Sequence, residues 1–437
     1  MYLKVLISLE KKVITVERLN DKYCEVQHKT GLKIVVFRTQ GYSTSYAILD
    51  VNYGSANNRF IDKNGKLLDT PLGIAHFLEH KMFENEDKTD TFELFAKTGA
   101  SANAFTDFEK TAYLFSGAGY LEDNLKILLN FVTHPYFTKG TVQKEQGIIA
   151  QEIKMYEDSP SWQVFFNAIS AMYQKHPIAN DIAGTVDSIA TITPELLYTC
   201  YDNFYSLNNM ILTVVGDVNE EKVINLVDKL LSDCKVENQI ANAKTYYEIE
   251  PTAVKTHRIS KTLPISITLA EIGFKENAYT LQENFLRQFI YEIVLDMIFG
   301  STSKFYEEVY KEGLVTESID TDVIWGVGYL ALLISMETNE PDELYKMMIE
   351  EIKQQREHGL NREDFELCKK SLLSRLIKTT ENLDDFALLL FDITRVGYDL
   401  DFVFKFIENI SFKDAEQLMH EGFKQERSVL SVVQANR

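Results

Sequence analysis

The feature of this sequence that most limits its fold is a weak repeat with a period of half the chain. Short matches between the two halves keep nearly one offset, and that offset is close to half of the 437 residues. The matching segments are residues 113–114 with 329–330, 192–193 with 410–411, and 212–215 with 430–433. Such a period indicates a duplicated supersecondary unit. We therefore predict an α+β fold made of two related domains.

Strand-like and helix-like patterns are mixed within the first half. Residues 46–49 and 210–215 are apolar runs of strand length. Residues 121–131 and 142–158 carry apolar side chains at helical spacing. This mixture of strands and helices is typical of an α+β fold.

The predicted domain limits rest on a polar stretch near the middle of the chain. Residues 237–257 show little periodicity, as a connecting segment would. We therefore predict a metal-binding domain over residues 1–236, a linker over 237–257, and a second related domain without a metal site over 258–437.

Composition narrows the classes of partner. The net charge is −20, with 45% hydrophobic and 25% charged residues, so nucleic acid and anionic membranes are not expected partners. The four cysteines form no C-x-x-C pair, which favours reduced thiols. The apolar run at residues 5–9 is too short for a signal peptide or a membrane span. We therefore expect a cytoplasmic protein.

The segment that carries chemistry is the pentapeptide from His76 to His80, with the pattern H-x-x-E-H. Each helical residue turns about 100°, so His76, Glu79 and His80 share one face of a helix. Two imidazoles one turn apart can bind one metal ion, and a carboxylate beside the ion can act as a general base. Thr70 and Pro71 are the predicted N-cap and first residue of this helix. The alternative is a pair of buried structural histidines.

A third metal ligand is expected from the predicted helix over residues 142–158. Glu145 and Glu152 lie two turns apart on one face, so one could bind the ion while the other supports a ligand. The alternative is a solvated acidic face. The offset of the repeat, applied to His76, reaches Val294, so the metal residues do not repeat. We expect one metal site, in the first half.

Taken in order, these segments resemble the pitrilysin/insulinase family of zinc metallopeptidases, the inverzincins, as a bacterial half-length member. The matching segments are His76–His80, residues 103–106, Glu145 to Glu152, and Gly216-Asp217. The resemblance implies Zn²⁺ as cofactor, with ligands His76, His80 and Glu152, general base Glu79, and Glu145 as support for the ligands. It places the glutamate ligand about seventy residues after the second histidine, which Glu152 satisfies.

The resemblance also implies a fold and a way of binding substrate. Family members have two related α+β domains, each an antiparallel sheet flanked by helices, and two such halves enclose a peptide chamber. Residues 101–106 are similar to the family's substrate-binding edge strand, which holds an extended peptide by main-chain pairing. The substrate-binding residues implied are Ala102, Asn103, Ala104, Phe105 and Thr106.

The sequence departs from the family in its second half. Active members supply an arginine and a tyrosine there, and Val309 and Thr316 stand at these positions. A related half-length subunit with the Arg/Tyr pair is therefore an expected partner in a heterodimer. The hypothesis is a zinc endopeptidase that cuts short or unfolded peptides, or matures a ribosomally made peptide. The alternative is a non-catalytic scaffold or processing subunit that retains the fold.

Overall fold

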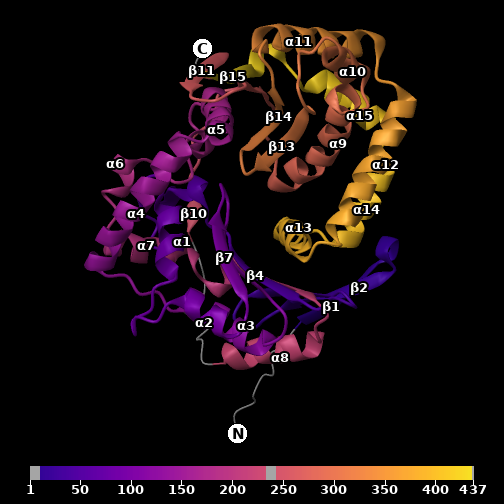
Figure 1. The fold of residues 1–437 in the computed structure, drawn as a ribbon. Coiled ribbons are helices and arrows are strands. Elements are labelled where there is room, and N and C mark those ends of the chain that lie inside the picture. The colour runs from indigo at the N-terminus through magenta and orange to yellow at the C-terminus, as the bar shows by residue number, and fades with distance from the viewer. Residues whose placement is uncertain (1–9, 233–242, 436–437) are drawn as a thin grey trace. The chain divides into compact units, whose positions relative to one another are not determined.

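The computed structural model describes residues 10–232 and 243–435 (Figure 1). The apolar run at residues 5–9 and the predicted domain limit at 236–237 lie outside the described residues. None of the helices in the described ranges is long and apolar enough to cross a bilayer.

Contacts divide the chain into two compact units, each built from separated segments. Unit 1 comprises Met1–Ala150, Ile182–Tyr246 and Ile377–Val403, and unit 2 comprises Gln151–Asp181, Tyr247–Leu376 and Phe404–Arg437. Each unit therefore takes segments from both halves of the sequence. The predicted domains, 1–236 and 258–437, are contiguous ranges that do not include this exchange of segments.

Unit 1 contains a seven-stranded sheet among its described residues, in the order β1-β2-β3-β9-β4-β8-β7. In that order the strands are Glu10–Val16, Asp21–Gln27, Lys33–Arg38, Met210–Gly216, Ser45–Val51, Thr111–Gly117 and Ser101–Thr106. Strands β3 and β9 pair in parallel, and the other described neighbours pair antiparallel. The predicted strands at residues 46–49 and 210–215 are confirmed as parts of β4 and β9.

Unit 2 contains a five-stranded sheet in the order β11-β15-β12-β14-β13. In that order the strands are Arg258–Leu263, Ser428–Ala435, Leu269–Lys275, Tyr329–Glu337 and Asp320–Gly326. Again one described pair, β11 with β15, is parallel and the others are antiparallel. This order repeats that of β3-β9-β4-β8-β7, so the predicted duplication of an α+β unit is confirmed.

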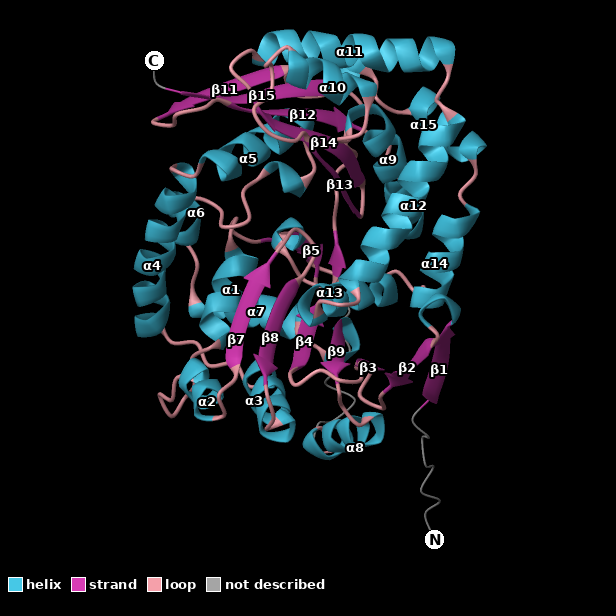
Figure 2. Cartoon of the chain, turned by 45° about the vertical axis from the view of Figure 1, so that its right-hand side comes forward, coloured by secondary structure: helices cyan, strands magenta, loops and turns pink. Residues whose placement is uncertain are grey.

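Helices flank both sheets. In unit 1, α3 (Leu121–Thr133) packs on β4 and β8, and α8 (Glu220–Leu230) packs on β3 (Figure 2). In unit 2, α9 (Leu281–Phe299) packs on β13 and β14. The other described helices and strands are α1 Ile74–Met82, α2 Thr91–Lys97, α4 Lys139–Glu157, α5 Pro160–Met172, α6 Val186–Ile189, α7 Pro194–Phe204, α10 Lys304–Lys311, α11 Pro341–His358, α12 Arg362–Thr379, α13 Leu383–Arg395, α14 Leu400–Asn409, α15 Phe412–Glu421, β5 Arg59–Ile61, β6 Leu67–Asp69 and β10 Lys244–Thr245.

Two helices pack on a sheet from the other half of the sequence. Helix α5 lies on β11, β12 and β15, where Val164 packs against Leu263 and Val433. Helix α13 lies on β4 and β9, and the rings of Phe37 and Phe386 meet edge to face at 4.7 Å. Figure 1 shows the orange-yellow α13 beside the indigo strands of unit 1. An ion pair of 3.1 Å between Lys110 and Asp392, and another between Glu109 and Arg395, connect α13 to the loop before β8.

The described end of the predicted linker is held firmly in unit 2. Both carboxylate oxygens of Glu250 accept backbone N–H groups after α5, at 3.0 Å from Gln174, 2.7 Å from Lys175 and 2.8 Å from His176. Glu250 also pairs with Lys275 at the end of β12, whose side chain is 4% exposed. Glu250 therefore fixes this part of the linker to the segment after α5 and to the end of β12.

We expect Glu250→Gln to lower the free energy of unfolding of unit 2 by about 3 kcal/mol, because it leaves the buried ammonium of Lys275 without its counter-charge. Glu248→Gln is the matched control, since Glu248 forms an exposed pair with Lys175 at 3.7 Å that is worth less than about 1 kcal/mol. Both tryptophans, Trp162 and Trp325, lie in unit 2, so urea unfolding followed by tryptophan fluorescence reports this unit. Equal losses of unfolding free energy in the two variants would contradict this role of Glu250.

Candidate metal centre

The helix that carries H-x-x-E-H begins later than predicted. Helix α1 starts at Ile74, after Gly73 in a left-handed conformation with φ 83°. A Cβ on Gly73 would lie 2.2 Å from the carbonyl oxygen of Ala183, so glycine is required there. The hydroxyl of Thr70 donates to the carbonyl of Asn58 at 2.8 Å and does not cap a helix. The predicted start at Thr70 and Pro71 is therefore wrong, because a contact distant in sequence decides the turn.

The structure brings together the three residues predicted to bind metal. His76 and His80 lie one turn apart on α1, with ring centroids 4.6 Å apart. One ligand atom from each histidine and one carboxylate oxygen of Glu152 lie within 4.8 Å of one another. Glu152 lies on α4. This helix continues without a break past Ala150, the residue at which the first segment of unit 1 ends.

This donor set suits a zinc ion. Two imidazole nitrogens and one carboxylate oxygen are the protein ligands of many catalytic zinc sites, which leave a fourth position open. His76 is 7% exposed, so an ion bound there would be shielded from bulk water on one side. The Tyr156 hydroxyl donates to Glu152 Oε1 at 2.7 Å and orients that carboxylate. The role of the three residues as zinc ligands stays a prediction.

Glu145 lies behind the second histidine, as predicted for a supporting carboxylate. His80 Nδ1 and Glu145 Oε1 are 3.0 Å apart, so Nδ1 carries the shared proton and Nε2 is left to face an ion. Burial raises the pKa of Glu145, but the hydrogen bond from His80 and the charges of His80 and Lys81 outweigh burial and bring the pKa below its ordinary value. Glu145 is therefore a carboxylate at neutral pH.

Glu79, the predicted base, is 6% exposed on α1. Its Oε2 accepts a hydrogen bond of 2.7 Å from the hydroxyl of Thr106, the last residue of β7. Thr106 was predicted from the family resemblance to bind substrate, and this contact with the base was not expected. No residue pattern could reveal it, because it joins a helix to a strand that lies beyond the next helix in the chain.

The predicted substrate-binding segment forms an edge of the sheet. Strand β7 ends the strand order of unit 1 and pairs with β8 in register from Ser101 with Ser116 to Thr106 with Thr111. Its side chains are partly or fully exposed. The roles of Ala102, Asn103, Ala104 and Phe105 in substrate binding stay predictions.

The two positions of the expected Arg/Tyr pair have other roles in this chain. Val309 is fully buried in α10. The hydroxyl of Thr316 donates to Glu337 at 3.1 Å on the surface of unit 2. Val309 has no hydrogen-bond donor in its side chain, and the one donor of Thr316 is used by Glu337.

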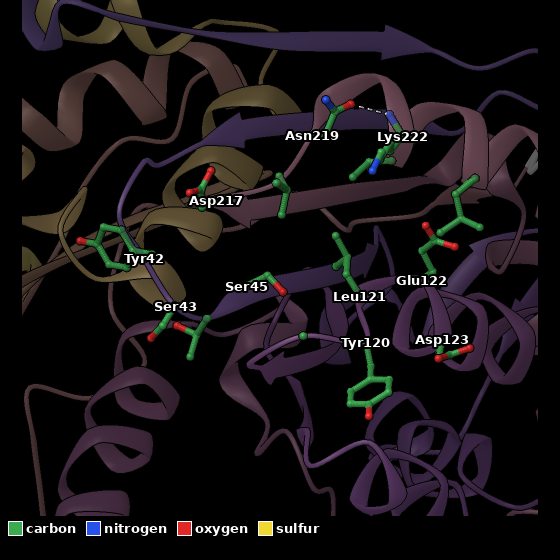
Figure 3. Close-up of a pocket in the computed structure, with 15 residues that line it drawn as sticks. Tyr42, Ser43, Ser45, Tyr120, Leu121, Glu122, Asp123, Asp217, Asn219 and Lys222 are labelled. Atoms are coloured by element: carbon green, nitrogen blue, oxygen red, sulfur yellow. Dashed lines mark hydrogen bonds between the residues drawn. The ribbon is translucent and has the colours of Figure 1, made fainter.

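A pocket of about 590 Å³ lies elsewhere in unit 1, between the N-terminal ends of α3 and α8 (Figure 3). Glu122, Asp123 and Asp217 give it an acidic lining, with Lys222 as a counter-charge. The Asn219 side chain accepts the backbone N–H of Lys222 at 2.9 Å, which caps α8. None of the predicted site residues lines this pocket, so it is separate from the candidate metal centre.

Two family models and a sequence relative match this chain. The model of the insulinase family, peptidase family M16, matches residues 33–186, and that of the peptidase M16 inactive domain matches residues 191–372. The uncharacterized zinc protease YmfH of Bacillus subtilis is 36% identical over 427 residues, which cover 95% of this chain and 97% of YmfH.

Solved structures show the same fold. A structure described as that of an M16-like peptidase from Alicyclobacillus acidocaldarius matches with a TM-score of 0.91 and 28% identity, over 98% of this chain and all of that one. The periplasmic protease PqqL of Escherichia coli matches with a TM-score of 0.74 and 17% identity, over 98% of this chain and 48% of PqqL. The sequence and structural matches extend over nearly the whole chain, and we conclude that it belongs to peptidase family M16, the insulinase family of zinc proteases.

Proposed function

We propose that this chain is a zinc-dependent endopeptidase in which His76, His80 and Glu152 bind Zn²⁺ and Glu79 is the general base. The observation that carries the proposal is the convergence of the three ligand atoms within 4.8 Å, on helices α1 and α4. The family and the zinc protease YmfH support the same chemistry.

The protein side chains divide the work of peptide hydrolysis. Zinc, when bound, supplies a Lewis acid that polarises the scissile carbonyl. Glu79 takes a proton from the attacking water and gives it to the leaving amine. The hydroxyl of Thr106 donates to one oxygen of Glu79 and thereby orients the carboxylate of the base. Glu145 keeps Nδ1 of His80 protonated and thereby orients its ring.

The edge strand β7 indicates the class of substrate. A peptide that pairs with β7 must be extended, and main-chain pairing is indifferent to most side chains. We therefore propose short or unfolded peptides as substrates in the cytoplasm, with maturation of a ribosomally made peptide as a narrower version.

A non-catalytic scaffold or processing subunit is the second candidate function. The observation in its favour is the pair Val309 and Thr316, since neither offers the expected donor. A scaffold, however, has no use for a buried carboxylate beside two histidines and a third ligand. The assembled residues of α1 and α4 therefore favour the enzyme.

We expect one zinc ion per chain, lost in His80→Ala and in Glu152→Gln, because each variant removes one of three protein ligands. Glu157→Gln is the control, since Glu157 is exposed on the same helix α4. Zinc content is measured by plasma emission after dialysis against metal-free buffer. Near-full occupancy in both ligand variants would refute the assignment.

Glu79→Gln should keep zinc and lose about 10²–10⁴-fold in peptidase rate, because an amide keeps the shape of the carboxylate but cannot accept the proton. Glu86→Gln, at an exposed position after α1, should retain the wild-type rate. Rates are measured with an internally quenched peptide on zinc-loaded protein. Activity of Glu79→Gln within a few-fold of wild type would show that another group is the base.

A related subunit that carries the Arg/Tyr pair should raise the activity of this chain by about 10²–10³-fold, the value of lost oxyanion donors. The match of this chain to 48% of PqqL supports a cleft made of two such halves. Val309→Arg should not restore the chain alone, because Val309 is fully buried and α10 has no room for a guanidinium. Full activity of the purified chain without any partner would exclude the heterodimer requirement.

A further inference from the structure

Lys81, the residue after the second histidine, is fully buried. Lysine is almost never fully buried unless it is paired. Its ammonium contacts Glu84 Oε1, just after the end of α1 at Met82, and lies 4.0 Å from Glu145 Oε2 on α4. Both contacts are ion pairs without an aligned hydrogen bond. Since a methionine or leucine could fill the same space without an ion pair, the buried charge calls for a function.

The two oxygens of Glu145 face different partners. Oε1 accepts the Nδ1 proton of His80 at 3.0 Å, and Oε2 faces the ammonium of Lys81. A carboxylate held at one oxygen only can rotate about its terminal bond and misalign the other contact. The charge of Lys81 attracts Oε2 and so favours the carboxylate orientation in which Oε1 meets the Nδ1 proton of His80.

These contacts form a row of alternating acidic and basic side chains that ends at a predicted metal ligand: Glu84, Lys81, Glu145, His80. All four side chains belong to unit 1. We propose that Lys81 is a positioning residue that acts through Glu145 to hold His80 in its metal-binding orientation. This inference rests on the proposed zinc site. It adds a residue outside the H-x-x-E-H pattern to the support of that site.

The test compares zinc affinity in wild type, Lys81→Met, Lys81→Arg and Lys275→Met. Affinity is measured by competition with a chromophoric chelator, and the zinc-free proteins are melted in parallel. Lys81→Met should weaken zinc binding about 10–100-fold, as loss of outer contacts to a metal ligand does. Lys81→Arg keeps the positive charge, so its zinc affinity should be much closer to that of wild type than to that of Lys81→Met.

Lys275→Met is the matched control, because Lys275 is also a buried lysine paired with a glutamate, in unit 2. It should lower the melting temperature and leave the zinc affinity close to that of wild type. If Lys81 has only a structural role, Lys81→Met will likewise lower the melting temperature without weakening zinc binding. That result would overturn the proposal. If Lys81→Met does not fold, Lys81→Gln replaces it with the same expected and contrary outcomes.

A double-mutant cycle shows whether Lys81 acts through Glu145. In a Glu145→Gln background, Lys81→Met should cause little further loss of zinc affinity, because the contact through which it acts is already gone. Equal losses in both backgrounds would overturn the proposed route. Wild-type protein that binds no zinc would instead refute the proposed function, so the two failures are distinguishable.

Discussion

The candidate centre depends on one hydrogen bond, between His80 on α1 and Glu145 on α4. Helix α1 provides two imidazoles and the carboxylate of Glu79, which is the proposed base, and the third proposed ligand comes from α4. The bond of 3.0 Å ties α4 to α1 two helical turns before Glu152. The same helix therefore anchors itself with one glutamate and presents the other to the histidines.

The parts of the site that depend on helical periodicity could be predicted from the sequence. His76, His80 and the pair Glu145 and Glu152 lie where their spacing placed them, because a helix fixes the angle between residues one or two turns apart. The start of α1 could not be predicted, since it depends on the approach of Ala183 to Gly73. The burial of Lys81 was equally hidden, because its partner Glu145 lies on a helix much further along the chain.

For the fold, the strands and the duplication could be predicted, but the exchange of α5 and α13 could not. The apolar face of α13 shows that this helix packs on other apolar residues, but it does not indicate which of the two sheets provides them.

The two halves of the duplication also differ in their chemistry. Val294, the repeat position of His76, is fully buried in α9, where it packs in the core of unit 2. The match of residues 191–372 to an inactive domain agrees with this difference.

The exchange of α5 and α13 constrains how the chain can be made. A ribosome releases β4 and β9 long before α13, so the sheet of unit 1 lacks one of its covering helices until Arg395 has been synthesised. Helix α5, in turn, emerges well before β11, the first strand of its own sheet. Unit 1 therefore cannot be completed before most of unit 2 has been synthesised. A gene cut at the linker would therefore yield one fragment without α13 and one without α5, and each fragment would expose a sheet face that the other fragment covers.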